Sequence, residues 1–452
     1  MQNAVPKLKH GMLQLSAVAL AITALIGCGG SGSDSSGGNI IEPPVSQCSA
    51  TGEKQQFIDY MYDDYFWASD LPSSVDAADY EDVYEVLEAL RVPEDRFSFL
   101  LTEEEYESRY VNASFAGFGF SSELVDGNRV FLRYVYDDSP AAQAGLGRAD
   151  ELLAIDGESV ASLLASGAYN DALGPGQVGI QRELTWRKPN GDELTALVTK
   201  DNVDTNTVFA PTVLETNGQR VGYFVLDSFI NRTGADLNDA YNLLAAEGVD
   251  ELVIDVRYNG GGLIRYANQI SSQAAGNNVL GEVFITYNFN EQNQNRNETE
   301  LFNLGEGIEQ LDLARVFVLT TGASCSSSEI IINSLEPFVE VVVIGEPTCG
   351  KPVGQSVQQL CDKYTFVVNF ETVNANGNGQ YFNGLQPDCP IADRIVADWA
   401  DPADPLTGAA LDYVANGACP AVADIPSQTP AAARAETRTA LPVLLEKWRS
   451  EH

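Results

Sequence analysis

The chain has 452 residues, room for about two or three domains, and 44% of them are hydrophobic, enough to bury folded cores. Its 26 Lys and Arg face 64 Asp and Glu, and this net charge of −38 argues against binding DNA, RNA or an anionic membrane surface. The two histidines are His10, in a predicted leader, and His452, the last residue. A mature Ser-His-Asp triad, Cys-His dyad or HExxH zinc site is therefore excluded.

Residues 1–27 have the three parts of an export signal. A basic start precedes an apolar run of 14 residues from Leu13 to Ile26, shorter than the roughly 18–20 that span a bilayer. The run ends before Cys28 and resembles the bacterial lipoprotein signal, in which that cysteine carries the lipid. Residues 28–47 would form a flexible tether. We expect a lipid-anchored, periplasm-facing protein of the bacterial outer membrane; the alternative is an ordinary signal peptide with an incidental cysteine.

Six cysteines follow the predicted leader: Cys48, Cys325, Cys349, Cys361, Cys389 and Cys419. An even number in an exported chain predicts disulfides, but many pairings are possible and the sequence does not choose among them. Cys361 and Cys389 flank a hairpin-like segment, which makes them a candidate pair. No CxxC pair is present, and this argues against a zinc ribbon or a thioredoxin-like site.

Residues 48–112 are predicted to form an N-terminal helical domain. Apolar residues recur at helical spacing at Val83, Val86, Leu87 and Leu90. Aromatic residues crowd the segment before them. We expect a small helical cap with an aromatic core.

Residues 113–205 change to a β-rich pattern. A strand is predicted at 130–135, a short helix ended by glycine at 139–146, and a strand running into a tight turn at 150–157.

A loop with alternating glycines opens this segment, at Gly117, Phe118, Gly119 and Phe120. Together with the elements that follow, it resembles a PDZ domain of the circularly permuted bacterial kind. The resemblance implies that backbone N–H groups of the loop bind a peptide's terminal carboxylate while the peptide adds a strand to the sheet edge. The alternative is a small β domain without a ligand.

Residues 206–418 alternate strands and helices, the pattern of a layered α/β domain. Continuous apolar runs, typical of strands covered on both faces, lie at 252–254, 316–319 and 341–344. Apolar residues that alternate along 221–225 predict a half-buried strand. Helices are predicted at 262–275, 327–336 and 404–416. Residues 419–452 form a Pro- and Ala-rich C-terminal tail.

A serine-rich segment, Thr321 to Ile330, follows one buried strand and opens a helix. A hydroxyl at a helix N-terminus lies near unpaired N–H groups that favour a developing negative charge. Taken alone, however, the segment is better explained as ordinary helix capping.

A lysine, Lys351, lies in a Gly-rich loop after another buried strand. Because the mature chain offers no catalytic histidine, a lysine is the natural general base. Burial must then lower its pKa from about 10.4 toward neutrality, so that the neutral amine can take a proton from a serine. The alternative for a lone lysine is a solvated surface charge.

Three consecutive glycines, Gly260 to Gly262, follow the run Asp255-Val256-Arg257-Tyr258-Asn259. Glycines let the backbone approach a ligand closely and point N–H groups inward. A phosphate-binding loop is disfavoured because the GxxxxGK[ST] spacing is absent and the chain is acidic.

Taken in order, these motifs resemble the C-terminal processing, or tail-specific, peptidases over roughly residues 50–415. The resemblance implies a ClpP/crotonase-like α/β core, an inserted PDZ-like β domain, an N-terminal helical cap and a serine/lysine dyad. The family's SxSxSE pattern places the nucleophile at Ser326; its lysine follows 25 residues later at Lys351, and its glutamine four residues after that at Gln355. The resemblance also implies an oxyanion hole formed by the N–H groups of Ser327 and Gly261.

The sequence departs from the family pattern beside both motifs. Cys325 and Ser327 replace the usual small alanines, and Pro352 follows the lysine where glycine is common. If Ser326 and Lys351 touch, Cys325 and Cys349 would lie near each other, and a disulfide between them is a hypothesis.

We therefore expect a serine endopeptidase without metal or cofactor that captures polypeptides by unstructured, apolar C-terminal tails. One alternative is a catalytically silent PDZ-containing binding protein on the same fold. A second is a different acyl hydrolase or a crotonase-type enzyme. The sequence leaves the oligomeric state and the natural substrate open.

Overall fold

The computed structural model describes residues 47–107, 110 and 114–420. The predicted leader 1–27, Cys28, nearly all of the tether 28–47 and the tail from residue 421 lie outside the described residues. Among the helices that are described, none combines the length and apolar character needed to cross a membrane.

A six-stranded sheet forms the centre of the α/β core, in the order β10-β11-β12-β15-β16-β21. These strands are β10 Val208–Thr216, β11 Gln219–Leu226, β12 Glu251–Asp255, β15 Arg315–Thr320, β16 Glu340–Gly345 and β21 Cys389–Pro390. Neighbouring strands from β11 to β21 pair in parallel, and β10 pairs antiparallel to β11. The ends of β12, β15 and β16 therefore meet at one edge, where the predicted motifs begin.

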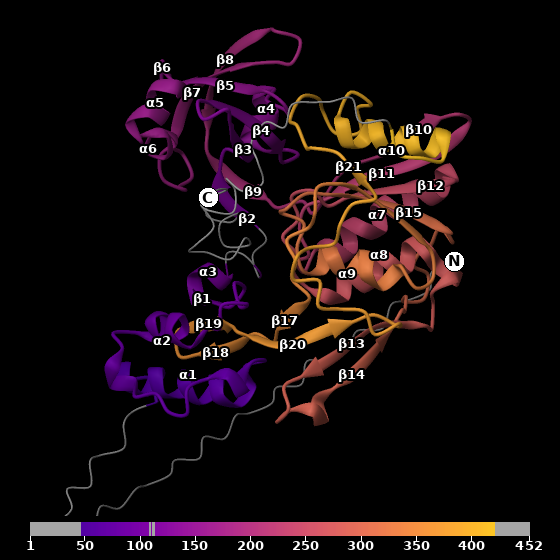
Figure 1. The fold of residues 1–452 in the computed structure, drawn as a ribbon. Coiled ribbons are helices and arrows are strands. Elements are labelled where there is room, and N and C mark those ends of the chain that lie inside the picture. Colours follow the sequence, from indigo (N-terminus) through magenta and orange to yellow (C-terminus); the bar gives the residue numbers. More distant parts are fainter. Residues whose placement is uncertain (1–46, 108–109, 111–113, 421–452) are drawn as a thin grey trace, which may run out of the picture. The chain divides into compact units, whose positions relative to one another are not determined.

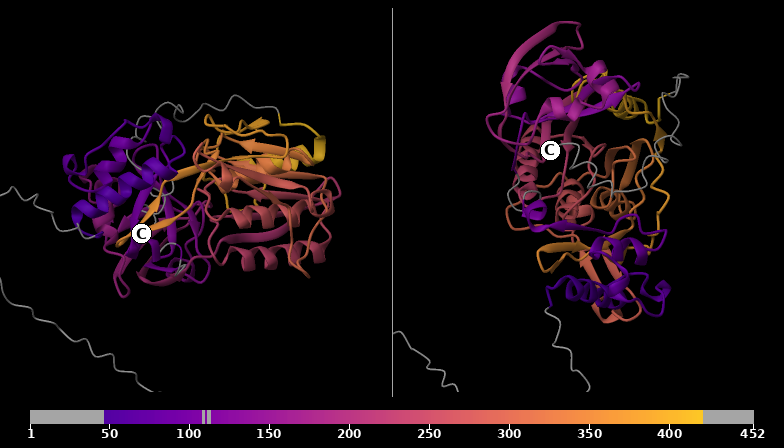
Figure 2. Two further views of the ribbon diagram at one scale, coloured as in Figure 1. Left: turned by 90° about the horizontal axis from the view of Figure 1, so that it is seen from below. Right: turned by 90° about the vertical axis from the view of Figure 1, so that its left-hand side faces the viewer.

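Helices cover both faces of this sheet (Figure 1). One face packs on α7 Thr233–Glu247, α8 Ile264–Ala275 and α9 Ser327–Leu335, and the other on α10 Pro405–Asn416. The turned views in Figure 2 show the same layers. The helices predicted at 262–275, 327–336 and 404–416 are confirmed as α8, α9 and α10. The predicted half-burial of the strand at 221–225 is wrong, because helices lie on both of its faces and all five residues are buried.

Two smaller sheets extend from the core. One has the order β14-β13-β20-β17, and the other the order β1-β19-β18. Their strands are β1 Phe99–Thr102, β13 Val283–Phe289, β14 Glu298–Leu301, β17 Val353–Gln355, β18 Gln358–Leu360, β19 Lys363–Phe366 and β20 Val368–Val373.

The N-terminal segment contains the expected helices α1 Ala50–Asp64 and α2 Val83–Leu90, with a short α3 at Glu103–Tyr106. It is not wholly helical, because β1 pairs antiparallel with β19 of the core. The predicted aromatic core is present, and it includes Cys325 from the serine-rich segment and Val353 from β17. This cap therefore packs directly against the segments that carry the predicted catalytic residues.

The β-rich segment folds as its own sheet, β3-β4-β5-β7-β8, with β6 paired to β5. Its strands are β3 Phe120–Val125, β4 Arg129–Val135, β5 Glu151–Ile155, β6 Glu158–Ser159, β7 Gln181–Arg187 and β8 Glu193–Thr199. Its helices are α4 Pro140–Ala144, α5 Val160–Ser166 and α6 Tyr169–Leu173. A ladder of β2 Ser114–Gly117 with β9 Asp201–Asp204 joins the two ends of the segment. The element order and the glycine-ended α4 match the expected PDZ-like domain.

Three disulfides are present among the described residues: Cys48–Cys361, Cys325–Cys349 and Cys389–Cys419. The predicted Cys361–Cys389 pair is wrong. Cys361 follows β18 and joins the start of the N-terminal cap, whereas Cys389 is buried in the α/β core on β21. The hypothesis of a Cys325–Cys349 disulfide is confirmed.

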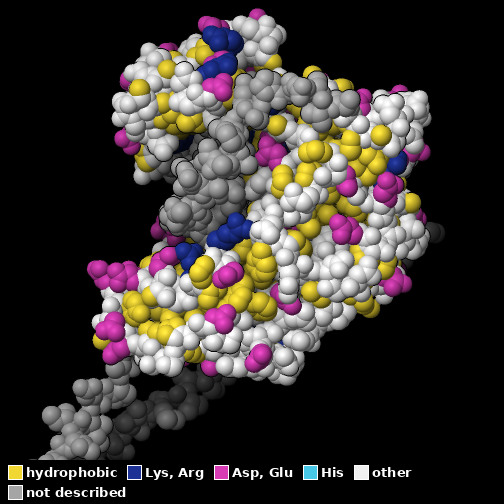
Figure 3. Space-filling model, in the orientation of Figure 1, with side chains coloured by type: hydrophobic (Ala, Val, Ile, Leu, Met, Phe, Trp, Pro, Cys, Tyr) yellow, Lys and Arg dark blue, Asp and Glu magenta, His cyan; other side chains and the backbone are white. Residues whose placement is uncertain are grey.

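The surface reflects the acidic composition. On the face seen in Figure 3, Asp and Glu side chains are spread over the described elements, and Lys and Arg side chains are fewer. This face carries no continuous basic patch of the kind that binds nucleic acid.

Candidate active site

Ser326 lies in the junction between β15 and α9, at the N-terminus of a helix whose nine residues are all buried. Its backbone has φ 56° and ψ −115°, a left-handed conformation that non-glycine residues rarely adopt. Such strain is maintained only where surrounding contacts fix it, and it is frequent at functional turns. The side chain is therefore held at a position where the helix N-terminus favours negative charge.

The buried carboxylate of Glu329 connects this junction to the lysine loop. It accepts hydrogen bonds from the backbone N–H of Ser326 at 2.8 Å, of Gly350 at 2.8 Å and of Lys351 at 2.9 Å. The Thr348 hydroxyl donates a fourth at 2.5 Å. Burial raises the pKa of Glu329 above its usual value near 4.5, and these hydrogen bonds offset only part of that effect. One side chain thus fixes both loops.

The Cys325–Cys349 disulfide makes a second, covalent connection between the same loops. The Cys349 N–H also donates to the Ser324 carbonyl at 3.0 Å. In the described part of the chain, the one group with metal-ligand spacing consists of these two cysteines and Glu329. Because the two sulfurs are bonded to each other, they are not available as thiolate ligands.

Lys351 is buried, with 3% of its surface exposed, so the alternative of a solvated surface charge is wrong. Its Nζ donates to Gln355 Oε1 at 2.9 Å. Gln355 Nε2 donates in turn to the carbonyl of Phe97 at 2.9 Å, and the Phe97 ring centre lies 5.6 Å from Nζ. Burial favours the neutral amine that a general base requires.

The glycine run packs against Ser326. Gly261 has φ 99°, and a Cβ atom there would lie 2.7 Å from Ser326 Cβ, so only glycine fits. Hydroxyl groups of the serine-rich segment hold this run: Ser327 Oγ donates to the Gly262 carbonyl at 2.8 Å, and Ser328 Oγ to the Asn259 carbonyl at 3.0 Å. The three predicted motifs therefore meet in one place.

The two predicted oxyanion donors differ in their surroundings. The Ser327 N–H lies in the first residue of α9, where backbone N–H groups have no partner within the helix. The Gly261 N–H donates to Asn259 Oδ1 at 2.8 Å, so this amide already has an acceptor. Its role in an oxyanion hole stays a prediction.

A buried ionic cluster behind the glycine run was missed by the sequence reasoning. Arg257 is fully buried and pairs with Asp255 at 2.7 Å, Asp393 at 2.8 Å and Asp404 at 2.9 Å. Arg148, from the β domain, reaches the same Asp404 at 3.3 Å. Burial would raise the pKa of Asp404, but the charge and hydrogen bonds of Arg257, the charge of Arg148 and the Thr407 N–H together outweigh it, and the pKa lies below the usual 3.8. The sequence offers one signal for this cluster, an acidic and a basic residue two positions apart at Asp255 and Arg257. Asp393 and Asp404 lie too far along the chain for the sequence to indicate that they pair with Arg257.

The predicted peptide-binding loop connects β2 to β3. Gly117 ends β2, Phe120 begins β3, and Phe118 is buried in the core of the β domain. Gly119 has φ 85°, and a Cβ atom there would lie 2.2 Å from Ser139 Cβ. In the described sheet β3 is an edge strand, the position at which an added peptide strand could pair. Carboxylate binding by the loop stays a prediction.

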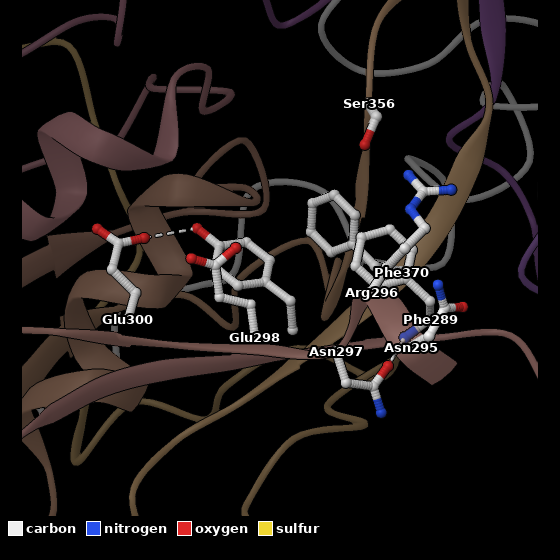
Figure 4. Close-up of a pocket in the computed structure, with 9 residues that line it drawn as sticks. Phe289, Asn295, Arg296, Asn297, Glu298, Glu300, Ser356 and Phe370 are labelled. Carbon is white, nitrogen blue, oxygen red and sulfur yellow. Dashed lines mark hydrogen bonds between the residues drawn. The ribbon is translucent and has the colours of Figure 1, made fainter. Parts of the chain in front are cut away.

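A separate pocket of about 680 Å³ lies on the four-stranded sheet (Figure 4). Its lining includes the aromatic rings of Phe289 and Phe370, the carboxylates of Glu298 and Glu300, and Ser356. None of the predicted catalytic residues lines it. The pocket is thus distinct from the place where the three motifs meet.

Comparisons with known proteins identify peptidases as relatives of this chain. Residues 220–391 match the family model for peptidase family S41, and residues 52–99 match the model for the peptidase S41 N-terminal domain. A carboxyl-terminal-processing protease of Picosynechococcus sp. is 31% identical over 290 residues, covering 62% of this chain and 66% of that protein. The protein of the same name from Synechocystis sp. is 28% identical over 365 residues, covering 78% and 82%.

A solved S41 protease from Bacteroides fragilis has the same fold, with a TM-score of 0.66 at 21% identity over 79% of this chain and 96% of that one. The fold is thus the predicted α/β peptidase core with its inserted β domain and N-terminal cap. The chain therefore belongs to peptidase family S41, the C-terminal processing family of serine-type peptidases.

Proposed function

We propose that this chain is an endopeptidase in which Ser326 is the nucleophile, Lys351 the general base and Gln355 the residue that orients the lysine. The observation that carries the proposal is the double connection of the serine and lysine loops, by the Glu329 carboxylate and by the Cys325–Cys349 disulfide. The helix N-terminus at Ser326 has a capping box, but capping alone does not explain a buried lysine on a loop that is bonded to the same Glu329 carboxylate.

In this mechanism the neutral Lys351 amine takes the Ser326 proton as the hydroxyl oxygen attacks the scissile carbonyl carbon. The oxyanion that forms is stabilised by the Ser327 N–H, by the dipole of α9 and by the glycine run. Lys351 then returns the proton to the leaving amine, which departs and leaves an acyl-enzyme. Water, activated by the same amine, hydrolyses the ester and frees Ser326.

The substrates would be polypeptides held by their C-terminal tails. The relatives are named for carboxyl-terminal processing. The loop of Gly117, Phe118, Gly119 and Phe120 would bind the terminal carboxylate, and the edge strand β3 would pair with an extended, apolar tail. Such capture would bring an unfolded chain to Ser326.

We also propose that the protein acts at the periplasmic face of the bacterial outer membrane, anchored by a lipid on Cys28. The support is the sequence of the predicted leader. Metabolic labelling with a fatty acid is expected to mark the wild type and not Cys28→Ser. Equal labelling of both proteins would refute the anchor.

Cleavage of an unfolded substrate with an apolar C-terminal tail tests the catalytic assignment. Ser326→Ala and Lys351→Ala are each expected to lose roughly 10³-fold or more of kcat, as removal of a nucleophile or of its base does. Circular dichroism and thermal melting would establish that both variants are folded. Undiminished cleavage by either folded variant would refute the dyad.

A further inference from the structure

The N-terminal cap places one tight turn, residues 95–98, against the residues proposed for catalysis. Its Phe97 carbonyl accepts the hydrogen bond from Gln355 Nε2 at 2.9 Å, and its Phe97 ring lies over Lys351 Nζ. Arg96 donates to the carbonyl of Cys349 at 2.9 Å, two residues before the lysine. The turn therefore contacts the chain on both sides of Lys351, at Cys349 and at Gln355.

Asp95 determines the shape of this turn. Its carboxylate is buried, with 2% of the residue exposed, and it accepts three hydrogen bonds from within the turn, besides a side-chain hydrogen bond with Tyr65. Oδ1 accepts from the N–H of Phe97 at 3.0 Å and of Ser98 at 2.9 Å, and Oδ2 accepts from Ser98 Oγ at 2.5 Å. These bonds fix the backbone on both sides of the Phe97 carbonyl.

Ser98 anchors the turn to the strand that faces Gln355. The Val368 N–H donates to Ser98 Oγ at 2.9 Å, and Val368 pairs directly with Gln355 in the β17–β20 ladder. Ser98 and Asp95 therefore link the position of the Phe97 carbonyl to the pairing of β17 with β20.

A carbonyl can only accept a hydrogen bond, and this property orients the glutamine amide. Because the Phe97 carbonyl takes the Gln355 NH₂ group, the amide oxygen must face Lys351. In the flipped amide, an NH₂ group would face the amine and a carbonyl oxygen would oppose the Phe97 carbonyl. The two carbonyl oxygens would repel each other, and the NH₂ group would either oppose the protonated amine or occupy the lone pair that the neutral amine needs as a base.

We propose that Asp95 is a positioning residue of the peptidase: it holds the Phe97 carbonyl where it fixes the Gln355 amide and, through it, the Lys351 amine. This inference rests on the proposed function. If it holds, the N-terminal cap positions the groups that transfer the proton, in addition to covering the peptidase core. The charged or titratable groups around the lysine loop are Glu329, Arg96 and Asp95, with Tyr381 near Glu329 and Tyr65 next to Asp95.

The variants are Asp95→Ala and Asp95→Asn, with Glu94→Ala as the matched control. Glu94 is the neighbouring acid, and its side chain is exposed. The alanine removes all three bonds inside the turn, whereas the asparagine keeps one oxygen for the two backbone N–H groups and loses the oxygen that accepts from Ser98 Oγ. The measurement is the pH dependence of kcat and kcat/KM on a tailed substrate, with thermal melting alongside.

Asp95→Ala is expected to lower kcat roughly 10- to 100-fold, the range expected when a catalytic group is misplaced. It is also expected to move the acid limb of the pH profile to higher pH. A loosened turn admits water to Lys351, and restored solvation, worth up to several pKa units, outweighs the loss of one acceptor, worth about one. Asp95→Asn is expected to lie between wild type and Asp95→Ala, and Glu94→Ala to match wild type.

An acid limb at the wild-type pH in either folded Asp95 variant would overturn the inference, whatever the fall in kcat. If Asp95→Ala does not fold, the position of the acid limb in Asp95→Asn tests the inference in the same way. Failure of the proposed function is distinguishable, because Ser326→Ala and Lys351→Ala would then still cleave the substrate.

Discussion

Cys325 and Cys349 form a disulfide that joins the residue before Ser326 to the residue two positions before Lys351. The serine and lysine loops are separated in sequence by α9 and β16, so their spacing depends on tertiary contacts. The disulfide and the Glu329 carboxylate fix that spacing by independent means.

Replacement of this disulfide is expected to lower activity as well as stability. The double variant Cys325→Ala/Cys349→Ala opens a loop with a sequence separation of 24 and is expected to lose about 3 kcal/mol of unfolding free energy. It is also expected to lose roughly tenfold or more in kcat, since both loops gain freedom. Denaturant unfolding and steady-state kinetics measure the two effects.

The matched control is Cys389→Ala/Cys419→Ala, which opens a loop of similar separation, 30, away from the serine and lysine loops. It is expected to lose similar stability and to keep wild-type kcat. Equal losses of kcat in both double variants would show that the Cys325–Cys349 disulfide contributes only to stability.

Glu329→Gln tests the carboxylate that joins the loops. Each of the two carboxylate oxygens accepts two hydrogen bonds. Whichever way the glutamine amide is oriented, its NH₂ group therefore faces two hydrogen-bond donors. We expect a loss of about 2–4 kcal/mol in unfolding free energy and a fall in kcat. Glu340→Gln is the control: it lies at an exposed position of β16 and removes one exposed ion pair with Arg315, so it is expected to cost less than about 1 kcal/mol.

The same variant has a defined pH dependence. Burial raises the folded-state pKa of Glu329 above 4.5, so ionisation costs more in the folded than in the unfolded protein. The stability of wild type relative to Glu329→Gln should therefore be greatest below pH 4.5 and should fall as pH rises from there through the raised pKa. A difference that grows with pH would contradict the raised pKa.

Gly119→Ala tests capture by the β domain. An added Cβ meets Ser139 at 2.2 Å in a backbone conformation that favours glycine, so the loop must move. KM for a substrate with a free C-terminal carboxylate is expected to rise about tenfold, or about 1.4 kcal/mol, with a smaller effect on its amidated form.

Gly127→Ala is the control for this prediction. Gly127 has a similar positive φ of 75° in a hairpin turn, and an added Cβ there would meet no atom within 4 Å. If Gly119→Ala and Gly127→Ala raise KM equally for the free and the amidated substrate, the loop does not bind the terminal carboxylate.

Arg148→Met tests the contact between the β domain and the peptidase core. Arg148 pairs with Asp404 where both side chains are 1% exposed, and its guanidinium lies 3.8 Å from the Trp399 ring centre. Because Asp404 keeps its pairs with Arg257, we expect a loss of about 2 kcal/mol, below that of an orphaned charge.

Arg187→Met removes pairs whose arginine side chain is 41% exposed, and it is expected to cost less than about 1 kcal/mol. Unfolding in denaturant compares the two variants. Equal losses of unfolding free energy would contradict the expectation that the buried Arg148–Asp404 pair contributes more than the exposed pairs of Arg187.

The parts of the site that could be predicted from sequence share a property: they are short motifs with fixed spacing. Ser326, Lys351 and Gln355 follow buried strands whose apolar runs are evident, and the helix after Ser326 has its own capping signal. Parallel strands bring such segments to one edge of a sheet, so linear order predicts proximity.

What could not be predicted depends on long-range packing. The Phe97 carbonyl meets Gln355 across 258 residues, and a backbone carbonyl has no signature in the sequence. Asp404 meets Arg257 across 147 residues, and either could equally have been a surface charge. The β11 strand alternates as a half-buried strand does, and only the helix on its second face explains its full burial.

The most direct test of the central claim is to locate the residue labelled by a serine-reactive covalent probe. The wild type is expected to carry the label on Ser326, with labelling lost in Ser326→Ala and strongly reduced in Lys351→Ala, whose serine lacks its base. Label on another residue, or labelling of Lys351→Ala at the wild-type rate, would contradict the serine/lysine mechanism.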